Sequence, residues 1–130
     1  MKTYLIDSDV FIDFFKKNIL AEKLLEELGR KKRLRISILT ITELRSGWNE
    51  EQAAFYLPRL YAIAKILPLT QKIAEHAGEF RFEYKKKGKP LATVDVLIGA
   101  TAIANNCCLV TRNAKDYPMP EIELYKEIYN

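Results

Sequence analysis

The sequence contains a single histidine, His76, among its 130 residues. A hydrolytic mechanism that divides proton transfer between two histidines is therefore excluded. A Ser-His-Asp triad would have to form around His76, which lies in a predicted amphipathic helix far along the chain from the acidic residues discussed below. The sequence also lacks a Walker phosphate loop and a Gly-rich dinucleotide fingerprint. These absences leave carboxylate chemistry as the main candidate.

Cysteines and long apolar runs are also scarce. The two cysteines, Cys107 and Cys108, are adjacent, and adjacent cysteines rarely bridge each other. We therefore expect a reducing, cytoplasmic setting. The longest mostly apolar run, residues 96–104, is far shorter than the roughly 20 residues that a membrane-spanning helix needs. Because Asp7 and Asp9 interrupt the first apolar stretch, we expect no secretory signal and no membrane association.

Glycine and proline are few, with five of each, while 48% of the residues are hydrophobic and 29% are charged. This composition excludes a disordered or fibrous chain, and the length predicts a single domain over residues 1–130. The net charge is +4, and many of the basic residues form two clusters. The clusters are Arg30, Lys31, Lys32, Arg33 and Arg35, and Lys85, Lys86, Lys87 and Lys89. Each cluster could bind a polyanion through counterion release, but taken alone each is better explained as a solvated helix end.

Short apolar segments alternate with longer amphipathic segments along the chain. The predicted strands are residues 3–6, 34–39, 65–69, 107–111 and a short segment at 122–124. The predicted helices are residues 20–28, 40–46, 50–64 with a kink or break at Pro58, 73–84 and 93–105. This alternation is typical of an α/β fold, and right-handed crossovers place helices on both faces of a mainly parallel sheet. We expect a three-layer α/β/α sandwich.

Four acidic residues occupy related positions in this predicted fold. Asp7 ends the first strand, and Glu43 lies in the helix after the second. Asp95 is in the first turn of the most apolar helix, and Asp116 follows the strand at 107–111. In a parallel sheet the carboxyl ends of the strands and the amino ends of the crossover helices share one edge, where open α/β folds place their sites. We therefore expect the four carboxylates to meet there.

Four carboxylates at one edge would repel one another and raise their own pKa values. A bound divalent cation would remove that conflict. Carboxylate oxygens select hard ions such as Mg²⁺ or Mn²⁺ over Zn²⁺, which prefers nitrogen and sulfur ligands. The sequence therefore predicts a metal-dependent hydrolase.

Each acid also has a simpler explanation as part of a helix cap. Asp7 could cap the following helix, and residues 40–43 (Thr-Ile-Thr-Glu) match a capping box. Asp95 could complement the helix dipole with Thr93 as the cap, and residues 113–116 could begin another helix. For any single acid both explanations stay open, and the shared location of the four favours the metal.

Four motifs carry a resemblance to a known family. The sequence resembles the motifs of PIN domains, in order, at residues 4–13 (YLIDSDVFID), 37–47 (SILTITELRSG), 95–102 (DVLIGATA) and 109–117 (LVTRNAKDY). Each motif alone is loosely defined, but the four together cover essentially the whole chain. The small format most resembles the VapC toxins of prokaryotic toxin–antitoxin pairs.

The resemblance implies an endoribonuclease that depends on Mg²⁺ or Mn²⁺. Asp7, Glu43, Asp95 and Asp116 match the family's acidic quartet. The resemblance makes Asp7 and Asp95 direct metal ligands, while Glu43 and Asp116 complete the shell or act on the attacking water. It also implies a cognate antitoxin, whose tail blocks the active site, and a homodimer.

Other residues of the motifs are given supporting roles by the same resemblance. Thr111 and Asn113 match polar positions that support the fourth acid. Asp9 stands where many relatives carry Asn, and its extra charge could tighten metal binding or merely cap the helix. Tyr117 replaces a common Phe, and we expect this change to be harmless.

Five basic residues are candidate RNA contacts. Arg112 is next to the acidic site in sequence and could bind phosphate or be an ordinary surface arginine. Lys85, Lys86, Lys87 and Lys89 are candidates for contacts with the RNA backbone.

Two alternative functions stay open. The segment Asp7-Ser8-Asp9-Val10 fits the nucleophile motif of haloacid-dehalogenase-type phosphatases, in which Asp7 would accept the phosphoryl group and Asp9 would act as the acid. That chemistry also needs a downstream lysine and a paired-acid metal motif, and neither stands out. The other alternative is a PIN domain that binds RNA without cutting it, which the presence of all four acids argues against.

Overall fold

Four parallel strands form the centre of the molecule, whose computed structural model describes residues 2–129. The strands are β1 (Thr3–Ile6), β2 (Leu34–Ser37), β3 (Ala64–Leu67) and β4 (Cys107–Val110), in the spatial order β3-β2-β1-β4. Thr3 of β1 is paired with Cys107 of β4, and Ile6 with Val110, so these two strands end level with each other. Leu124 adds an isolated parallel bridge to Leu109, where the sequence predicted a short strand.

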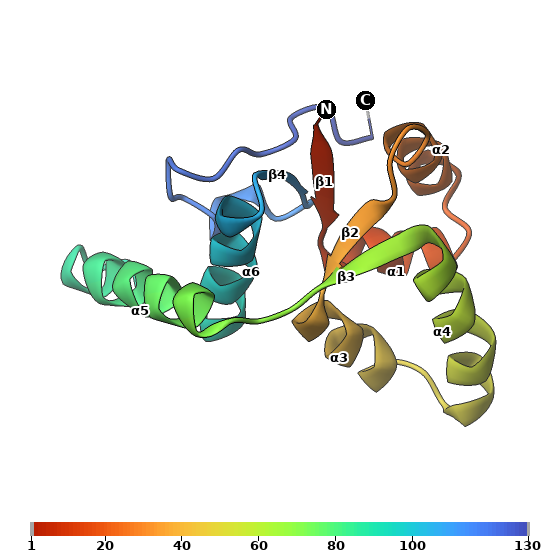
Figure 1. Ribbon diagram of the computed structural model, residues 1–130, viewed down its shortest axis with the longest axis horizontal. Coiled ribbons are helices and arrows are strands. Elements are labelled where there is room, and N and C mark those ends of the chain that lie inside the picture. The colour runs from red at the N-terminus through yellow and green to blue at the C-terminus, as the bar shows by residue number, and fades with distance from the viewer. Residues whose placement is uncertain (1, 130) are drawn as a thin grey trace.

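Helices cover both faces of the sheet, as the alternating sequence pattern predicts (Figure 1). The helices are α1 (Ser8–Phe15), α2 (Ile19–Leu28), α3 (Ile38–Ser46), α4 (Glu50–Ile63), α5 (Gln71–Lys86) and α6 (Thr93–Ala104), and a short 3₁₀ helix, η1, spans Ala114–Asp116. In Figure 1, α5 and α6 lie on one side of the strands and α1 to α4 on the other. The expected three-layer α/β/α sandwich is confirmed. Within residues 2–129, no helix combines the length and apolarity that a membrane crossing requires.

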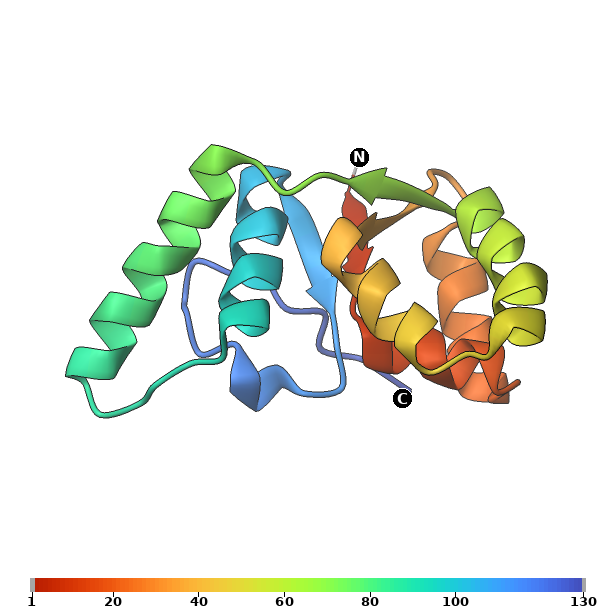
Figure 2. The same cartoon turned by 90° about the horizontal axis from the view of Figure 1, so that it is seen from below.

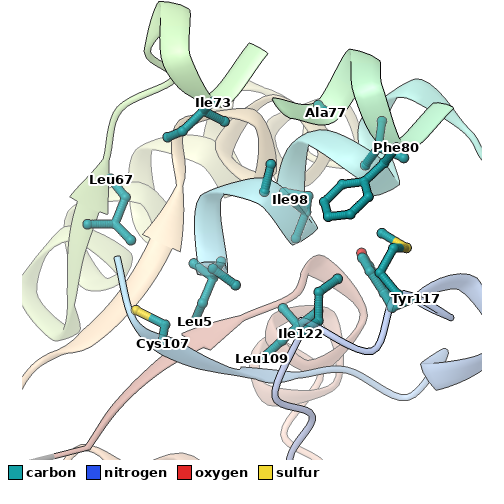
Figure 3. Close-up of a cluster of buried hydrophobic side chains, with 14 of the residues drawn as sticks. Leu5, Leu67, Ile73, Ala77, Phe80, Ile98, Cys107, Leu109, Tyr117 and Ile122 are labelled. Atoms are coloured by element: carbon teal, nitrogen blue, oxygen red, sulfur yellow. The ribbon is translucent and has the colours of Figure 1, made fainter. Parts of the chain in front are cut away.

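The two faces of the sheet have separate hydrophobic cores because successive strand residues point to opposite faces. Leu5 of β1 belongs to the core under α5 and α6, whereas Ile6 belongs to the core under α1 to α4. Figure 3 shows the first of these cores, where Phe80 of α5, Ile98 of α6 and Leu109 of β4 converge. Both cores therefore hold β1 and β4 in place, and these two strands position the candidate site.

Some local predictions were wrong in detail. The second strand ends at Ser37, not at residue 39, because the Ser37 side chain accepts a hydrogen bond from the Leu39 amide and caps α3. Glu43 is thus in the middle of α3, and the predicted capping box at residues 40–43 does not form. Likewise α6 is capped by Ala92 without a side-chain hydrogen bond, not by Thr93. Pro58 lies inside α4 without splitting it.

The segment after η1 folds back over α6. A Cβ atom on Gly99 would lie 2.6 Å from Cδ1 of Ile122, so a larger residue here would force the Ile122 side chain to shift. Met119 and Ile122 are buried there, and Tyr117 joins the same core. This packing fixes the backbone on which Asp116 and Tyr117 lie.

Candidate active site

The carboxyl edge of the sheet brings the predicted acids together. Figure 2 shows β1 and β4 running toward the same side, where α1 begins and η1 lies. Asp7 directly follows β1, and its amide donates to the carbonyl of Val110 at the end of β4. Asp116 is the last residue of η1, and Asp95 is in the first turn of α6.

Asp7 is the most enclosed of the four acids, with 8% of its surface exposed. It is the N-cap of α1, and its Oδ1 accepts a hydrogen bond of 2.9 Å from the Ser8 amide. Its Oδ2 accepts hydrogen bonds of 2.9 Å from both the Thr111 hydroxyl and the Tyr117 hydroxyl. Asp7 therefore caps a helix, as the simpler explanation required, and is also fixed in one orientation by residues from the opposite end of the chain.

Asp9 is anchored to the loop that follows β4. Its Oδ2 accepts hydrogen bonds from the Arg112 amide at 2.8 Å and from the Asn113 side-chain amide at 3.1 Å. Its Oδ1 is buried and has no hydrogen-bond partner among the described residues. Burial, followed by the charge of Asp7, raises the pKa of Asp9 above its usual value. Asp9 thus ties α1 to residues 111–113 and adds negative charge to the site.

Glu43, in α3, lies close enough to Asp7, Asp95 and Asp9 for their charges to affect its carboxyl group. Partial burial of its carboxyl group and the charge of Asp7 raise its pKa, with smaller increases from Asp95 and Asp9, while a hydrogen bond with Ser8 lowers it. A residue in the middle of α3 can therefore interact with acids on β1 and α6. The structure brings Glu43 to the edge that the sequence predicted, although not as the start of a helix.

Asp95 shows the same effect from the other side of the site. Its pKa is raised by partial burial, then by the charges of Asp116 and Asp7, and is lowered by the Tyr117 hydroxyl. Acidic neighbours rather than cations therefore surround this half-exposed carboxylate. Repulsion of this kind was predicted from the sequence for Asp7, Glu43, Asp95 and Asp116, and acidic neighbours raise the pKa of two of these residues, Glu43 and Asp95.

The chemistry of these donors fits a hard divalent cation. The donors at this edge are carboxylate oxygens, whereas His76 stacks on Phe80 in α5, with 4.4 Å between ring centroids. Cys108 is the second residue of β4 and so lies toward the opposite end of the strand, and burial raises the pKa of its thiol to about 11. Among residues 2–129, no three acidic, histidine or cysteine side chains stand close enough together to enclose a metal ion by themselves. An open carboxylate edge of this kind suits Mg²⁺, which retains waters and binds one or two carboxylates together with substrate phosphates.

The basic residues are distributed unevenly around this edge. Arg112 forms ion pairs with Asp13 and Asp9, with N–O distances of 3.0 Å and 4.0 Å. The second predicted group lies at the end of α5 and is exposed, and Lys87 contacts the ring of Tyr84 at 4.7 Å from its centroid. This group comprises Lys85, Lys86, Lys87 and Lys89. The basic residues 30–33 precede β2 and so lie at the opposite, amino edge of the sheet.

Sequence reasoning missed two residues that contact the site. Tyr117 was expected to be a harmless replacement of Phe, but its hydroxyl donates to Asp7. Asp13 received no role, although it follows Asp9 by four residues in α1 and pairs with Arg112. Residues four apart in a helix lie on the same face, so the spacing of the two aspartates was the available signal.

Comparison with known proteins decides the family. The sequence model of the PIN domain matches residues 4–118, which include every acid of the site. The chain belongs to the PIN-domain family. Relatives of this PIN domain include "Ribonuclease VapC10" of Mycobacterium tuberculosis, 31% identical over 90% of this chain and 87% of the relative. "Ribonuclease VapC1" of Methanocaldococcus jannaschii is 32% identical over 87% of this chain and 77% of its own.

Solved structures show the same architecture. VapBC2 from Rickettsia felis, bound to a DNA fragment from its promoter, contains a chain that matches with a TM-score of 0.84 and 27% identity. That match covers 95% of this PIN domain and 97% of the other chain. A toxin–antitoxin complex from Klebsiella pneumoniae matches with a TM-score of 0.77 and 29% identity, over 92% and 95% of the two chains. The fold that positions the acids is thus shared with proteins found in toxin–antitoxin complexes.

Proposed function

We propose that this PIN domain is a metal-dependent endoribonuclease and the toxin of a VapBC-like toxin–antitoxin pair. The observation that supports this function most strongly is the gathering of Asp7, Glu43 and Asp95 at one sheet edge, where the charge of Asp7 raises the pKa of both other acids and the charge of Asp95 raises that of Glu43. Relatives that carry the name ribonuclease VapC and share about 30% of the sequence point to the same chemistry.

The side chains divide the work according to their burial and contacts. Asp7 and Asp95 would hold the ion, because Asp7 is fixed by Thr111 and Tyr117 while Asp95 is half exposed and forms no recorded ion pair within residues 2–129. When bound, Mg²⁺ or Mn²⁺ neutralises charge that develops on the phosphoryl oxygens and lowers the pKa of water. Glu43 carries a raised pKa, which suits a group that accepts a proton from the attacking water. Asp116 completes the ligand set beside Asp95.

The remaining polar residues support these acids. Thr111 donates to Asp7 and accepts a hydrogen bond of 3.1 Å from the Asn113 amide, so the loop after β4 holds the first ligand in place. Asp9 holds the same loop through the Arg112 and Asn113 nitrogens. Because Asp7 and Asp9 both accept hydrogen bonds from residues 111–113, this loop determines the shape of the site.

RNA is the substrate class that we assign, with Arg112, which pairs with Asp9 and Asp13, as the basic residue beside the acids. Lys85, Lys86, Lys87 and Lys89 supply more distant positive charge for the phosphate backbone. We further propose a cytoplasmic location, a homodimer and neutralisation by a cognate antitoxin, since the structural neighbours are VapBC complexes.

Cleavage of labelled RNA in Mg²⁺, Mn²⁺ or EDTA tests this function. We expect cleavage by the wild type with either metal, none in EDTA, and none by Asp95→Asn. Glu79→Gln is the matched control, because it changes an exposed carboxylate on α5 to an amide away from the acidic edge. RNA that is bound but never cut in either metal would contradict the nuclease and favour the non-catalytic alternative.

A phosphatase assay on the same wild-type protein tests the phosphatase alternative. In that mechanism Asp9 would exchange a proton with substrate, but its Oδ2 is engaged by the Arg112 and Asn113 nitrogens and its Oδ1 is buried. We expect no hydrolysis of p-nitrophenyl phosphate. Turnover of that ester by the wild type, lost in Asp9→Asn, would support the phosphatase.

A further inference from the structure

We infer that Asp13 and Tyr129 form a C-terminal latch that positions Arg112 as a phosphate-binding side chain beside the acidic site. The latch comprises these three residues, which come from α1, the last residues of the chain and the loop after β4. The inference rests on the proposed function, because it names how the RNA is held at that same site.

A single carboxylate oxygen connects the three residues. Oδ2 of Asp13 lies 3.0 Å from Nε of Arg112 and accepts a hydrogen bond of 2.6 Å from the Tyr129 hydroxyl. Burial, followed by the hydrogen bond to Asp13, raises the pKa of Tyr129, so its hydroxyl remains a donor. Asp13 is thereby held by Tyr129 while it holds Arg112.

The C-terminal segment reaches α1 because it is bound to β4 on its way. Leu109 donates its amide to the Glu123 carbonyl at 2.8 Å, and its carbonyl accepts from the Tyr125 amide at 2.9 Å. Ile128 and Tyr129 then pack against the core under α1 to α4, and the Tyr129 hydroxyl reaches Asp13 of α1. Tyr129 adopts a φ of 59°, which is rare for a bulky side chain and indicates that its contacts hold it.

The guanidinium group of Arg112 has hydrogen-bond donors that its ion pairs do not use. Its ion pairs use Nε, and for residues 2–129 the structure records no hydrogen bond from its two terminal guanidinium nitrogens. The side chain is 46% exposed, while Asp13 is only 18% exposed. A guanidinium with two free terminal nitrogens matches two phosphate oxygens, which is the geometry of bidentate recognition. The backbone amide of Arg112 meanwhile binds Asp9, so its side chain starts directly at the site.

A double-mutant cycle on RNA binding tests the latch. The four proteins are the wild type, Tyr129→Phe, Arg112→Ala and the double variant, and the probe is a fluorescent single-stranded RNA oligonucleotide in EDTA. Tyr125→Phe is the matched control, because it removes a tyrosine hydroxyl from the same segment. Within residues 2–129 no hydrogen bond of the Tyr125 hydroxyl is recorded, and its ring packs edge-on against Tyr4.

We expect Arg112→Ala to weaken binding about 10-fold and to reduce the slope of log Kd against log salt by about 0.7, the value for one phosphate contact of a single strand. Tyr129→Phe should weaken binding about 3-fold, and Tyr125→Phe should leave it unchanged. In the Arg112→Ala background the effect of Tyr129→Phe should vanish, because Tyr129 acts on RNA only through the guanidinium group that this variant lacks. With cleavage restored by metal, Tyr129→Phe should raise KM and leave kcat unchanged.

Two results would overturn the latch. Equal affinity of Tyr129→Phe and the wild type would show that Tyr129 does not act on RNA. An equal loss in both backgrounds would assign Tyr129 a general structural role. Neither result affects the proposed nuclease, which fails only if the wild type does not cut RNA in metal.

Discussion

The two edges of the sheet differ in how their charged side chains are partnered. At the amino edge, Lys2 pairs with Glu123, and Arg33 donates to the carbonyls of Tyr61 and Ala64 at 2.6 Å and 3.1 Å. At the carboxyl edge, Glu43 and Asp95 face other acids. The ion pairs recorded there among residues 2–129 all belong to Arg112.

This difference separates a stabilising arrangement from a binding arrangement. Opposite charges that meet at a surface contribute little to stability but cost little either. Like charges that meet in a partly buried site disfavour ionisation and lower the stability of the folded chain at neutral pH. The carboxyl edge therefore carries a free-energy cost that a cation would remove, and the amino edge does not.

The largest expected effect comes from changing one acid at the carboxyl edge. Asp95→Asn should lower kcat/KM for RNA cleavage at least about 100-fold, because it removes preorganised charge at the reacting phosphate. At the amino edge, Lys31→Ala should change kcat/KM less than about 2-fold, since Lys31 is exposed and lies at the other end of the strands. Comparable losses in both variants, measured in one cleavage assay, would break the distinction between the edges.

Metal ions should stabilise the protein through the carboxyl edge alone. A ligand that binds only the folded chain adds about 2.7 kcal/mol to the free energy of unfolding at 100 times its Kd. We expect Mn²⁺ to raise the melting temperature of the wild type by several degrees and to raise that of Asp95→Asn much less. Thermal unfolding with and without metal measures both, and an unchanged melting temperature in the wild type would count against the site.

The hydroxyl of Tyr117 should make a smaller contribution. Tyr117→Phe removes one of the three hydrogen bonds that hold Asp7, and hydrogen bonds to charged groups contribute about 1.5–3 kcal/mol. We expect denaturant unfolding to show a loss of about 1–2 kcal/mol without metal. Tyr4→Phe removes a hydroxyl outside the site and serves as the control. A loss below about 0.5 kcal/mol would restore the original expectation that the residue behaves as Phe.

The smallest effect should be a pH-dependent stability gain in Asp95→Asn without metal. The pKa of Asp95 is raised above 3.8 in the folded chain, so its folded form binds the proton more tightly than the unfolded form. Its contribution to the free energy of unfolding therefore falls as the pH rises from 3.8 through the raised value, and is constant above it.

We accordingly expect Asp95→Asn and the wild type to be almost equally stable near pH 3 and the variant to become more stable as the pH rises toward 7. Denaturant unfolding in EDTA across this range measures the difference. A variant that is less stable than the wild type at pH 7 would show that Asp95 mainly complements the helix dipole.

The sequence predicted the edge but not the contacts within it. Strand ends and helix starts are local features, so the positions of Asp7 and Asp95 followed from the apolar pattern and the parallel topology. Tyr117 and Asp13 were missed because their partners, Asp7 and Arg112, lie 110 and 99 residues away along the chain. No local pattern encodes the contact of Tyr117 with Asp7, and the spacing of Asp9 and Asp13 in α1 marks a shared helix face without naming Arg112 as the partner.

The start of α3 shows a second kind of error. Residues 38 and 39 are apolar and continue the strand pattern, so the strand was predicted to extend through them. The Ser37 side chain decides otherwise by accepting the Leu39 amide, and α3 therefore begins earlier. At this boundary between β2 and α3, the side-chain cap outweighs the apolar pattern of the sequence.

The most direct test of the shared acidic site is the anomalous scattering of Mn²⁺ in crystals of the wild-type protein. The account predicts an anomalous peak at the carboxyl edge, within ligand distance of Asp7 and Asp95, that is lost in crystals of Asp95→Asn grown in the same way. No peak at that edge at millimolar Mn²⁺, or a peak bound only elsewhere, would contradict it.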